Sequence, residues 1–262
     1  GIPVYCILGD KQARALSEHF SHGILNLNFG TTSSLSLDIG SKLIVREGFL
    51  SNVQFSTSSS YHYFIEGLVN STGALLEWLA KKRQSKHLLQ DMESAYRACA
   101  SQSLPIFYFP LRGIGSPFWQ YDLPSIATQL PKPNTDVFLA SCVEHIAFSI
   151  SSLILQLRAT AGIPSIELLQ VSGGLSEITT LVQLISNITK LPCKVHLTAS
   201  SALGAARAYE LHHQAGKENR LQSPPEVFPK AHGELQDRFD TWKVMEKALL
   251  DRTHSQFSVI PL

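Results

Sequence analysis

The chain has 262 residues, of which 44% are hydrophobic and 16% charged, so it has enough apolar material for one large core and is not wholly disordered. The 22 Lys and Arg residues nearly balance the 21 Asp and Glu residues, giving a net charge of +1, and nucleic acid is therefore not an expected partner. No apolar run approaches the roughly 20 residues that span a bilayer, so no membrane association is expected either.

The first part of the chain predicts strands separated by short turns. The apolar segment Val4–Leu8 is typical of a buried strand, and the helical spacing that follows predicts a helix over Lys11–Phe20. Ile24–Phe29 and Ser34–Ile39 alternate apolar and polar residues, which predicts an antiparallel hairpin. The serine-rich stretch Ser51–Ser60 is interpreted as a loop.

Helices alternate with single strands in the rest of the chain. Gly73–Arg83 predicts a helix whose cationic end is a solvated terminus, with a binding patch as the less favoured alternative. Asn134-Thr135-Asp136 can cap a long apolar helix that ends near Ala161. Further strands are predicted at Tyr61–Ile65, Ile106–Phe109, Ile166–Val171 and Lys194–Leu197, and further helices over 178–188, 200–213 and 234–251. This order predicts a layered α/β fold with a mixed sheet.

The composition divides the chain into three parts. Residues 1–213 form the predicted domain, the polar, proline-containing stretch 214–233 a linker, and 234–262 a closing helix and tail. Four cysteines, none in a CxxC pair, argue against a zinc cluster and are interpreted as reduced thiols of a cytoplasmic protein; they are Cys6, Cys99, Cys142 and Cys193.

Three glycine-containing turns follow predicted strands: Gly30-Thr31-Thr32, Gly113-Ile114-Gly115-Ser116 and Ser172-Gly173-Gly174. Glycine lets backbone N–H groups approach an anionic or flat ligand, and a turn that opens a helix adds a positive dipole. Each turn by itself is more often purely structural. Three such turns in one domain indicate a nucleotide site.

Asp10 follows the first predicted strand, beside Gly9. Its carboxylate could take the proton of a hydroxyl as a general base in a phosphoryl transfer. The alternative is that Asp10 only caps the helix after it, and the spacing alone does not separate the two roles.

Seven segments, together with the last predicted helix, carry a family resemblance. They are Ile7–Ala13, Asn28–Thr32, Glu66–Trp78, Tyr108–Trp119, Val143–Phe148, Ser172–Gly174 and Ser201–Ala206, with Arg238, Phe239 and Trp242 in the last helix. In this order they resemble the motifs of the C-terminal domain of FGGY-family carbohydrate kinases of the glycerol kinase and xylulokinase type, over nearly the whole chain.

The resemblance implies a ribonuclease H-like (actin-like ATPase) domain, with a mixed five-stranded sheet flanked by helices. It implies an ATP-dependent phosphotransferase acting on a sugar or polyol hydroxyl, with ATP and Mg²⁺ as cofactors. Asp10 would be the catalytic base and would contact substrate together with Lys11. The residues that fall where the family binds nucleotide are Thr31, Gly73, Glu77, Gly174 and Ile178. No resident metal site is expected in this domain.

No segment of the chain matches the family's first domain, which carries its other phosphate-binding turn. The chain is therefore expected to be one lobe that needs an N-terminal kinase domain as partner and is inactive alone; a homo-oligomer is compatible with the sequence.

Four positions depart from the family pattern: Lys11 replaces Gln, Ser172 replaces Asp, Ile178 replaces the Asn of glycerol kinases, and Gln129 replaces Gly. The first three motivate an alternative, a non-catalytic actin-like nucleotide-binding or scaffold module. The presence of Asp10 and Thr31 favours the kinase.

Overall fold

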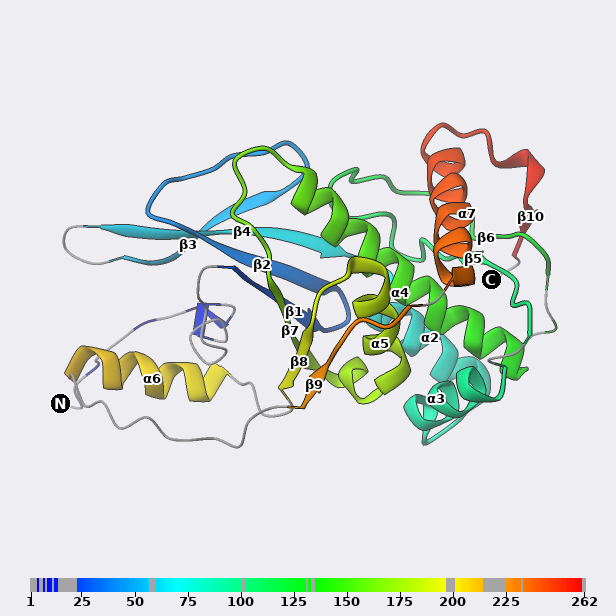
Figure 1. Cartoon of the computed structure of the whole chain (residues 1–262), viewed down its shortest axis with the longest axis horizontal. Helices are drawn as coiled ribbons and strands as arrows, with labels where there is room; N and C mark the ends of the chain where they lie inside the picture. The colour runs from blue at the N-terminus through cyan, green and yellow to red at the C-terminus, as the bar shows by residue number, and fades with distance from the viewer. Residues whose placement is uncertain are drawn as a thin grey trace.

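A seven-stranded mixed sheet runs through the middle of the molecule, in the order β3-β4-β2-β1-β7-β8-β9 (Figure 1). The computed structural model describes residues 4, 7, 9–10, 12–13, 23–56, 60–99, 102–130, 132, 135–196, 201–213, 225–231 and 233–260. The strands are β1 (Ile24–Phe29), β2 (Ser33–Gly40), β3 (Leu50–Ser56), β4 (Tyr61–Val69), β7 (Leu168–Gly173), β8 (Cys193–His196) and β9 (Glu226–Val227). The pairs β1–β7 and β7–β8 are parallel, and the other neighbours are antiparallel.

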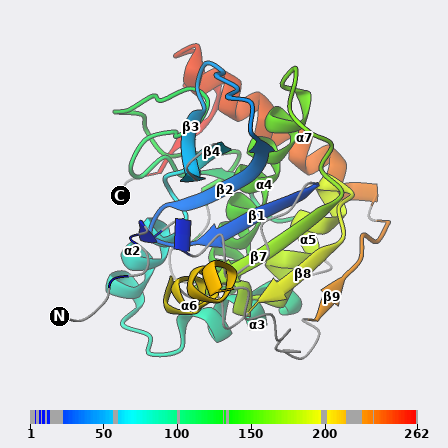
Figure 2. The same ribbon diagram turned by 90° about the vertical axis from the view of Figure 1, so that its left-hand side faces the viewer.

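Helices cover both faces of this sheet. Figure 1 places α4 and α5 on one side and α6 on the other, and Figure 2 views the same layers with α6 toward the reader. The helices are α2 (Gly73–Arg83), α3 (Leu88–Ala98), α4 (Asp136–Ala159), α5 (Thr179–Thr189), α6 (Ser201–His213) and α7 (Gly233–Leu250), with 3-10 turns at Gly174–Glu177 and His254–Gln256. The short strands β5 (Phe107–Tyr108), β6 (Ile126–Ala127) and β10 (Ser258–Val259) form a separate sheet in the order β10-β6-β5.

The predicted α/β class with a mixed sheet is confirmed, but the sheet has seven strands rather than five. Strands β4-β2-β1-β7-β8 form its centre, and β3 and β9 extend it at the two edges. Strand β3 overlaps the predicted loop Ser51–Ser60 and begins one residue before it. Strand β9 lies within the predicted linker 214–233, of which 214–224 and 232 are outside the described residues. An edge strand is held by backbone pairing and needs no apolar face: the one fully buried side chain of β3 is the polar Gln54.

The predicted first strand is not confirmed where the structure describes it. Val4 and Ile7 lie outside any strand and are 76% and 91% exposed. Both sides of β1 are already occupied by β2 and β7, so the sheet has no place for a strand beside it. In the helix predicted over Lys11–Phe20, Gln12 and Ala13 are helical, and the remainder is outside the described residues.

Helix α4 forms the centre of the core. Its N-cap Thr135 accepts a hydrogen bond from the backbone N–H of Phe138 at 3.2 Å, at the predicted capping position. The helix is long and apolar enough to cross a membrane, which the sequence analysis did not anticipate. However, 89% of its most apolar stretch is buried inside the fold, as in the central helix of a globular domain. Three of the four cysteines, Cys99, Cys142 and Cys193, are buried and unpaired, and Cys6 is outside the described residues.

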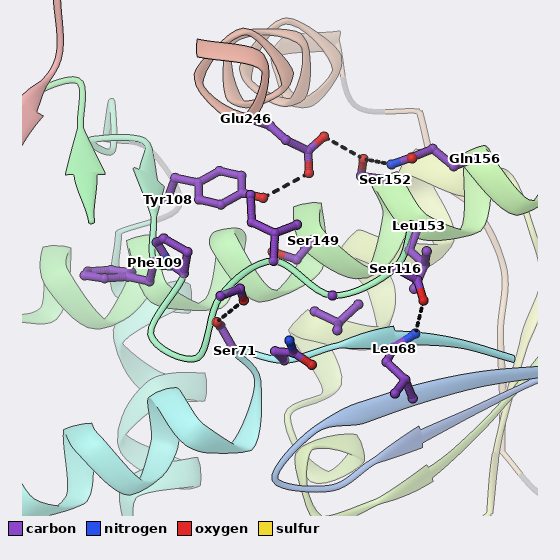
Figure 3. Close-up of a pocket in the computed structure, with 16 residues that line it drawn as sticks. Leu68, Ser71, Tyr108, Phe109, Ser116, Ser149, Ser152, Leu153, Gln156 and Glu246 are labelled. Atoms are coloured by element: carbon purple, nitrogen blue, oxygen red, sulfur yellow. Dashed lines mark hydrogen bonds between the residues drawn. The ribbon is translucent and has the colours of Figure 1, made fainter. Parts of the chain in front are cut away.

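The closing helix α7 belongs to the same core and carries a partly buried glutamate into it. Glu246 accepts hydrogen bonds from the Tyr108 hydroxyl at 3.0 Å and the Ser152 hydroxyl at 3.3 Å, beside a cavity of about 30 Å³ (Figure 3). Burial raises the pKa of Glu246 to about 7. One turn earlier in α7, Trp242 Nε1 donates to Nδ1 of the fully buried His145 at 3.2 Å. Burial lowers the pKa of the His145 imidazole to about 3. His145 is therefore a neutral acceptor in the core.

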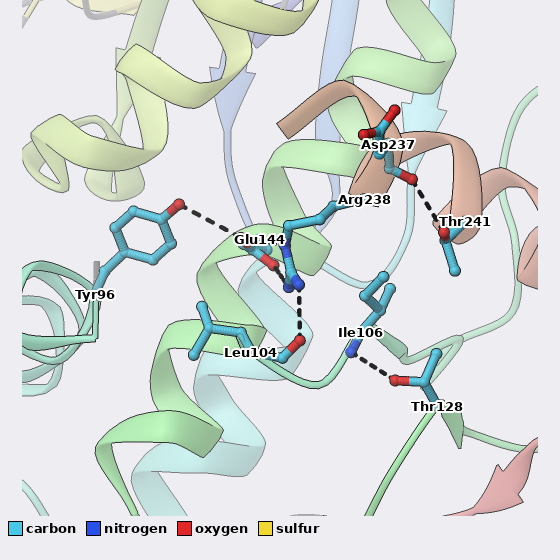
Figure 4. A network of polar contacts seen from close by, with 8 residues as sticks. All are labelled: Tyr96, Leu104, Ile106, Thr128, Glu144, Asp237, Arg238 and Thr241. Carbon is cyan, nitrogen blue, oxygen red and sulfur yellow. Dashed lines mark hydrogen bonds and ion pairs between the residues drawn. The ribbon is translucent and has the colours of Figure 1, made fainter. Parts of the chain in front are cut away.

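An ion pair between two helices fastens α7 to α4. Arg238 Nε donates to Glu144 Oε1 at 3.1 Å, and Nη2 of the same guanidinium donates to Oε2 (Figure 4). Arg238 Nη1 also donates to the Leu104 carbonyl at 2.8 Å, and the Tyr96 hydroxyl reaches Glu144 Oε1 at 3.5 Å. With side-chain exposures of 19% for Arg238 and 5% for Glu144, this pair is largely removed from solvent.

We expect Arg238→Ala to lower the free energy of unfolding by about 3 kcal/mol, because it leaves the Glu144 carboxylate buried without its cation. Chemical denaturation measures the change, and the exposed Lys247→Ala on the same helix is the control. The double variant with Glu144→Gln should recover part of the loss. A loss for Arg238→Ala no larger than for the control would contradict the assignment.

Glu246→Gln should stabilise the fold on the order of 1 to 2 kcal/mol at pH 8 and have little effect at pH 5. The folded-state pKa lies above the ordinary 4.5, so the folded state holds the proton more tightly. Stability from this group is thus present at low pH and lost as pH rises through about 7. Urea titrations at the two pH values test this, with the exposed Glu234→Gln as control. The same change at both pH values would refute it.

Candidate functional site

Two parallel strands end side by side and bring two of the predicted glycine turns together. Phe29, the last residue of β1, is the register partner of Gly173, the last residue of β7. Gly30 and Gly174 follow directly on these two residues. Ligands of open α/β sheets bind outside the carboxyl ends of neighbouring strands. A ligand is therefore expected at the carboxyl ends of β1 and β7.

The two glycines of the β7 turn are present for different reasons. Gly173 has φ +91°, and a Cβ there would lie 2.2 Å from the Phe29 carbonyl oxygen, so the close approach of β1 requires glycine. Gly174 is exposed, and a Cβ there would meet no protein atom within 4 Å. Nothing in the described part of the fold fills the space over Gly174, which leaves its backbone open to a ligand.

The N-terminus of α2 abuts the first glycine turn. A Cβ on Gly73 would lie 2.4 Å from the Gly30 carbonyl oxygen, so glycine is required for this contact. The backbone N–H of Ala74 donates to the Thr31 carbonyl at 3.0 Å. The positive end of the α2 dipole therefore faces the turn that carries Thr31, which is exposed.

The carboxylate of Glu77 joins the turn that carries Thr31 to the loop before Gly113. The Thr31 hydroxyl donates to Glu77 Oε1 at 3.3 Å, and Arg112 Nη2 donates to Glu77 Oε2 at 3.1 Å. The side chains of Glu77 and Arg112 are 51% and 55% exposed, so the whole group is open to solvent. The sequence analysis singled out Thr31 and Glu77 but not Arg112, because the loop around Arg112 was considered only for its glycines.

A second group missed from the sequence supports the turn after β7. Glu93 of α3 accepts hydrogen bonds at the start of α5, from the Thr180 backbone N–H at 3.0 Å and from the Thr179 and Thr180 hydroxyls at 2.7 Å each. Burial raises the pKa of Glu93, but these bonds and that from Arg97 outweigh it and lower the pKa overall. In the sequence, Glu93 stands four residues before Arg97, a spacing that indicates only an ion pair on the surface of one helix. The contact of Glu93 with α5 could not be predicted from that spacing.

Not every predicted site residue lies at this surface. Ile178 is fully buried in the core, so its side chain packs beneath the turn. Ser172 is also buried, between the strands, where its hydroxyl lies 3.4 Å from Asn28 Oδ1. Lys11 is outside the described residues.

Asp10 lies beside the start of α6. It is exposed, and the Ser201 hydroxyl at the start of α6 donates to its Oδ1. The segment is fixed against α6 at Gly204, because a Cβ there would overlap the Ala13 carbonyl. Asp10 thus contacts α6, whereas Thr31 contacts α2. In the part of the chain that the structure describes, no group of three His, Cys, Asp or Glu residues is placed to hold a metal ion.

Comparison with curated proteins finds relatives that are similar to most of this chain. The chain is 29% identical over 218 residues to the glycerol kinase of Aquifex aeolicus (strain VF5), covering 79% of this chain and 43% of that enzyme. It is 28% identical over 210 residues to the glycerol kinase of Geobacter sp. (strain M21), covering 78% of this chain and 42% of that enzyme. The chain therefore spans less than half the length of these relatives.

Solved structures share the fold. The Plasmodium falciparum glycerol kinase determined with ADP superposes with a TM-score of 0.77 at 20% identity, over 97% of this chain and 51% of that one. The xylulose kinase from Rhodospirillum rubrum gives a TM-score of 0.73 at 16% identity, over 94% of this chain and 51% of that one. The predicted actin-like fold is confirmed by these neighbours.

The family model that matches is the C-terminal domain of the FGGY family of carbohydrate kinases, and it matches residues 25–209, well over half of the chain. On this evidence, the chain belongs to the FGGY family of carbohydrate kinases and holds the family's C-terminal domain.

Proposed function

We propose that this chain is the nucleotide-binding lobe of an ATP-dependent kinase that phosphorylates a hydroxyl of a sugar or polyol. The observation that carries the proposal is the convergence of Gly30–Thr31, Gly73 and Gly174 at one edge of the sheet, with the space over Gly174 open. Backbone N–H groups, a hydroxyl and a helix N-terminus are the groups that bind phosphates. The curated relatives named as glycerol kinases support the reaction class.

In the proposed mechanism, Asp10 takes the proton of the attacking hydroxyl and Lys11 contacts the same substrate. The hydrogen bond from Ser201 orients the Asp10 carboxylate. Thr31, Gly73, Glu77 and Gly174 hold the nucleotide, while Ile178 supports the turn from below. Mg²⁺, bound chiefly through phosphate oxygens and water, would supply charge neutralisation at the transferred group.

The second partner in this proposal is an N-terminal kinase domain that completes the cleft and excludes water from it. The relatives are more than twice as long as the region they share with this chain, which leaves room for such a domain. The substrate class, the cytoplasmic location and any homo-oligomer belong to the complete gene product, so the experiments use that product.

One observation favours a second function, a nucleotide-binding module without transfer. The Glu77 carboxylate accepts the Thr31 hydroxyl and so brings negative charge to the proposed phosphate turn. Like charges disfavour a bound polyphosphate. In that case the full-length product binds nucleotide but turns over no sugar.

Asp10→Asn should lower kcat of the full-length product by about 10²- to 10⁴-fold, because it removes the base, and leave ATP affinity within about twofold. Release of ADP across a panel of polyols and ketoses measures kcat, and calorimetry measures binding. Asp251→Asn, an exposed carboxylate on a remote segment, is the matched control. A kcat of Asp10→Asn equal to that of the control would show that Asp10 is not the base.

Gly174→Ala should weaken ATP binding by about tenfold or more while shifting Tm by no more than about 2 °C. The new methyl group meets no protein atom within 4 Å, so any loss of affinity reports a ligand in that space. Gly233→Ala is the matched control, since a Cβ there also meets nothing within 4 Å. Unchanged ATP affinity in Gly174→Ala would place the nucleotide elsewhere.

A further inference from the structure

The loop that carries Arg112 is held in place by several backbone contacts, and the residues after Arg112 are buried. Asn70 Nδ2 donates to the Arg112 carbonyl at 3.2 Å, and the N–H of Gly113 donates to the Pro110 carbonyl at 2.9 Å. Gly113 has φ +77°, and a Cβ on it would lie 2.4 Å from the Gln120 carbonyl oxygen. The backbone at Arg112 is thus held on both sides.

The same loop is joined to the end of β4 by a reciprocal pair of bonds. The Ser116 N–H donates to the Leu68 carbonyl at 2.9 Å, and the Leu68 N–H donates to the Ser116 hydroxyl at 3.1 Å (Figure 3). A Cβ on Gly115 would lie 2.2 Å from the Leu68 carbonyl oxygen, so the loop lies directly on the strand. Since β4 continues through residues 70–72 into α2, the loop is fixed relative to the helix that carries Glu77.

The fixed backbone directs Arg112 to the group that holds Thr31. One carboxylate, Glu77, accepts the Arg112 guanidinium through Oε2 and the Thr31 hydroxyl through Oε1. The Arg112 guanidinium and the hydroxyl of the proposed phosphate turn therefore bind the same carboxylate. An exposed ion pair contributes little to stability, so stability does not explain the pairing of Arg112 with Glu77.

We propose that Arg112 binds the phosphates of a nucleoside di- or triphosphate and that Glu77 holds its guanidinium in place until they arrive. This inference rests on the proposed nucleotide site and adds to it a cation that the glycine turns lack. A planar guanidinium can donate two parallel hydrogen bonds to one phosphate group, and its charge offsets that of Glu77 beside the polyphosphate.

The test is calorimetric titration of the full-length product with ATP, ADP and adenosine. Arg112→Gln should weaken ATP and ADP by about tenfold or more and adenosine by less than about twofold, because only the first two carry the phosphates that Arg112 binds. Arg112→Lys should fall between, since an ammonium supplies charge without the paired geometry. Lys86→Gln, which removes an equal charge from an exposed position after α2, is the control.

The outcomes separate the inference from the function on which it rests. ATP affinity in Arg112→Gln equal to that of Lys86→Gln overturns the role of Arg112 and leaves the nucleotide site standing. An equal loss for adenosine and ADP also overturns it, because the variant then acts on the whole site and not on the phosphates. A wild-type product that binds none of the three ligands overturns both proposals.

Discussion

The parallel pairing of β1 with β7 is the constraint on which the rest of the structure depends. Their register joins Phe29 to Gly173, residues far apart in the chain, and sets two glycine turns next to each other. The pairing is so close that no side chain fits at Gly173. Parallel strands need a long crossover between them, and here that crossover includes the long, largely buried helix α4. The same connection between β1 and β7 therefore places the two glycine turns side by side and places α4 in the core.

A helix as buried as α4 must find partners for its polar groups inside the fold. Glu144 is satisfied by Arg238 and Tyr96, and His145 by Trp242, so the closing helix completes the hydrogen bonding of the central one. Aromatic stacking also joins α7 to β5, with the Tyr108 and Trp242 ring centroids 4.6 Å apart. Each of these groups would be costly if left alone in an apolar interior. This explains why α7 is part of the domain core although a proline-containing segment precedes it.

Sequence patterns predicted most helices and the central strands because burial imposes a period on the side chains, as in α5 and β2. Helix α3 was missed although Leu88, Met92 and Ala95 carry a helical period. The edge strands β3 and β9 were missed for a physical reason: backbone pairing holds them, and it leaves no pattern. At the site, the glycine turns were predicted because turns restrict residue type, whereas the role of Thr31 came from the family resemblance. The contacts of Glu77 with Arg112 and of Glu93 with Thr180 arise only when distant elements pack, so no local pattern contains them.

The place of α7 in the chain also governs how the domain is made on the ribosome. Phe239 and Trp242 pack against Phe148 of the central helix, yet they are synthesised some ninety residues later. Until they emerge, the nascent chain carries a long apolar helix whose surface for α7 is uncovered, and Glu144 and His145 lack their contacts with Arg238 and Trp242. An uncovered apolar surface favours aggregation, so the core of this domain is protected only after α7 has been synthesised and has packed on α4.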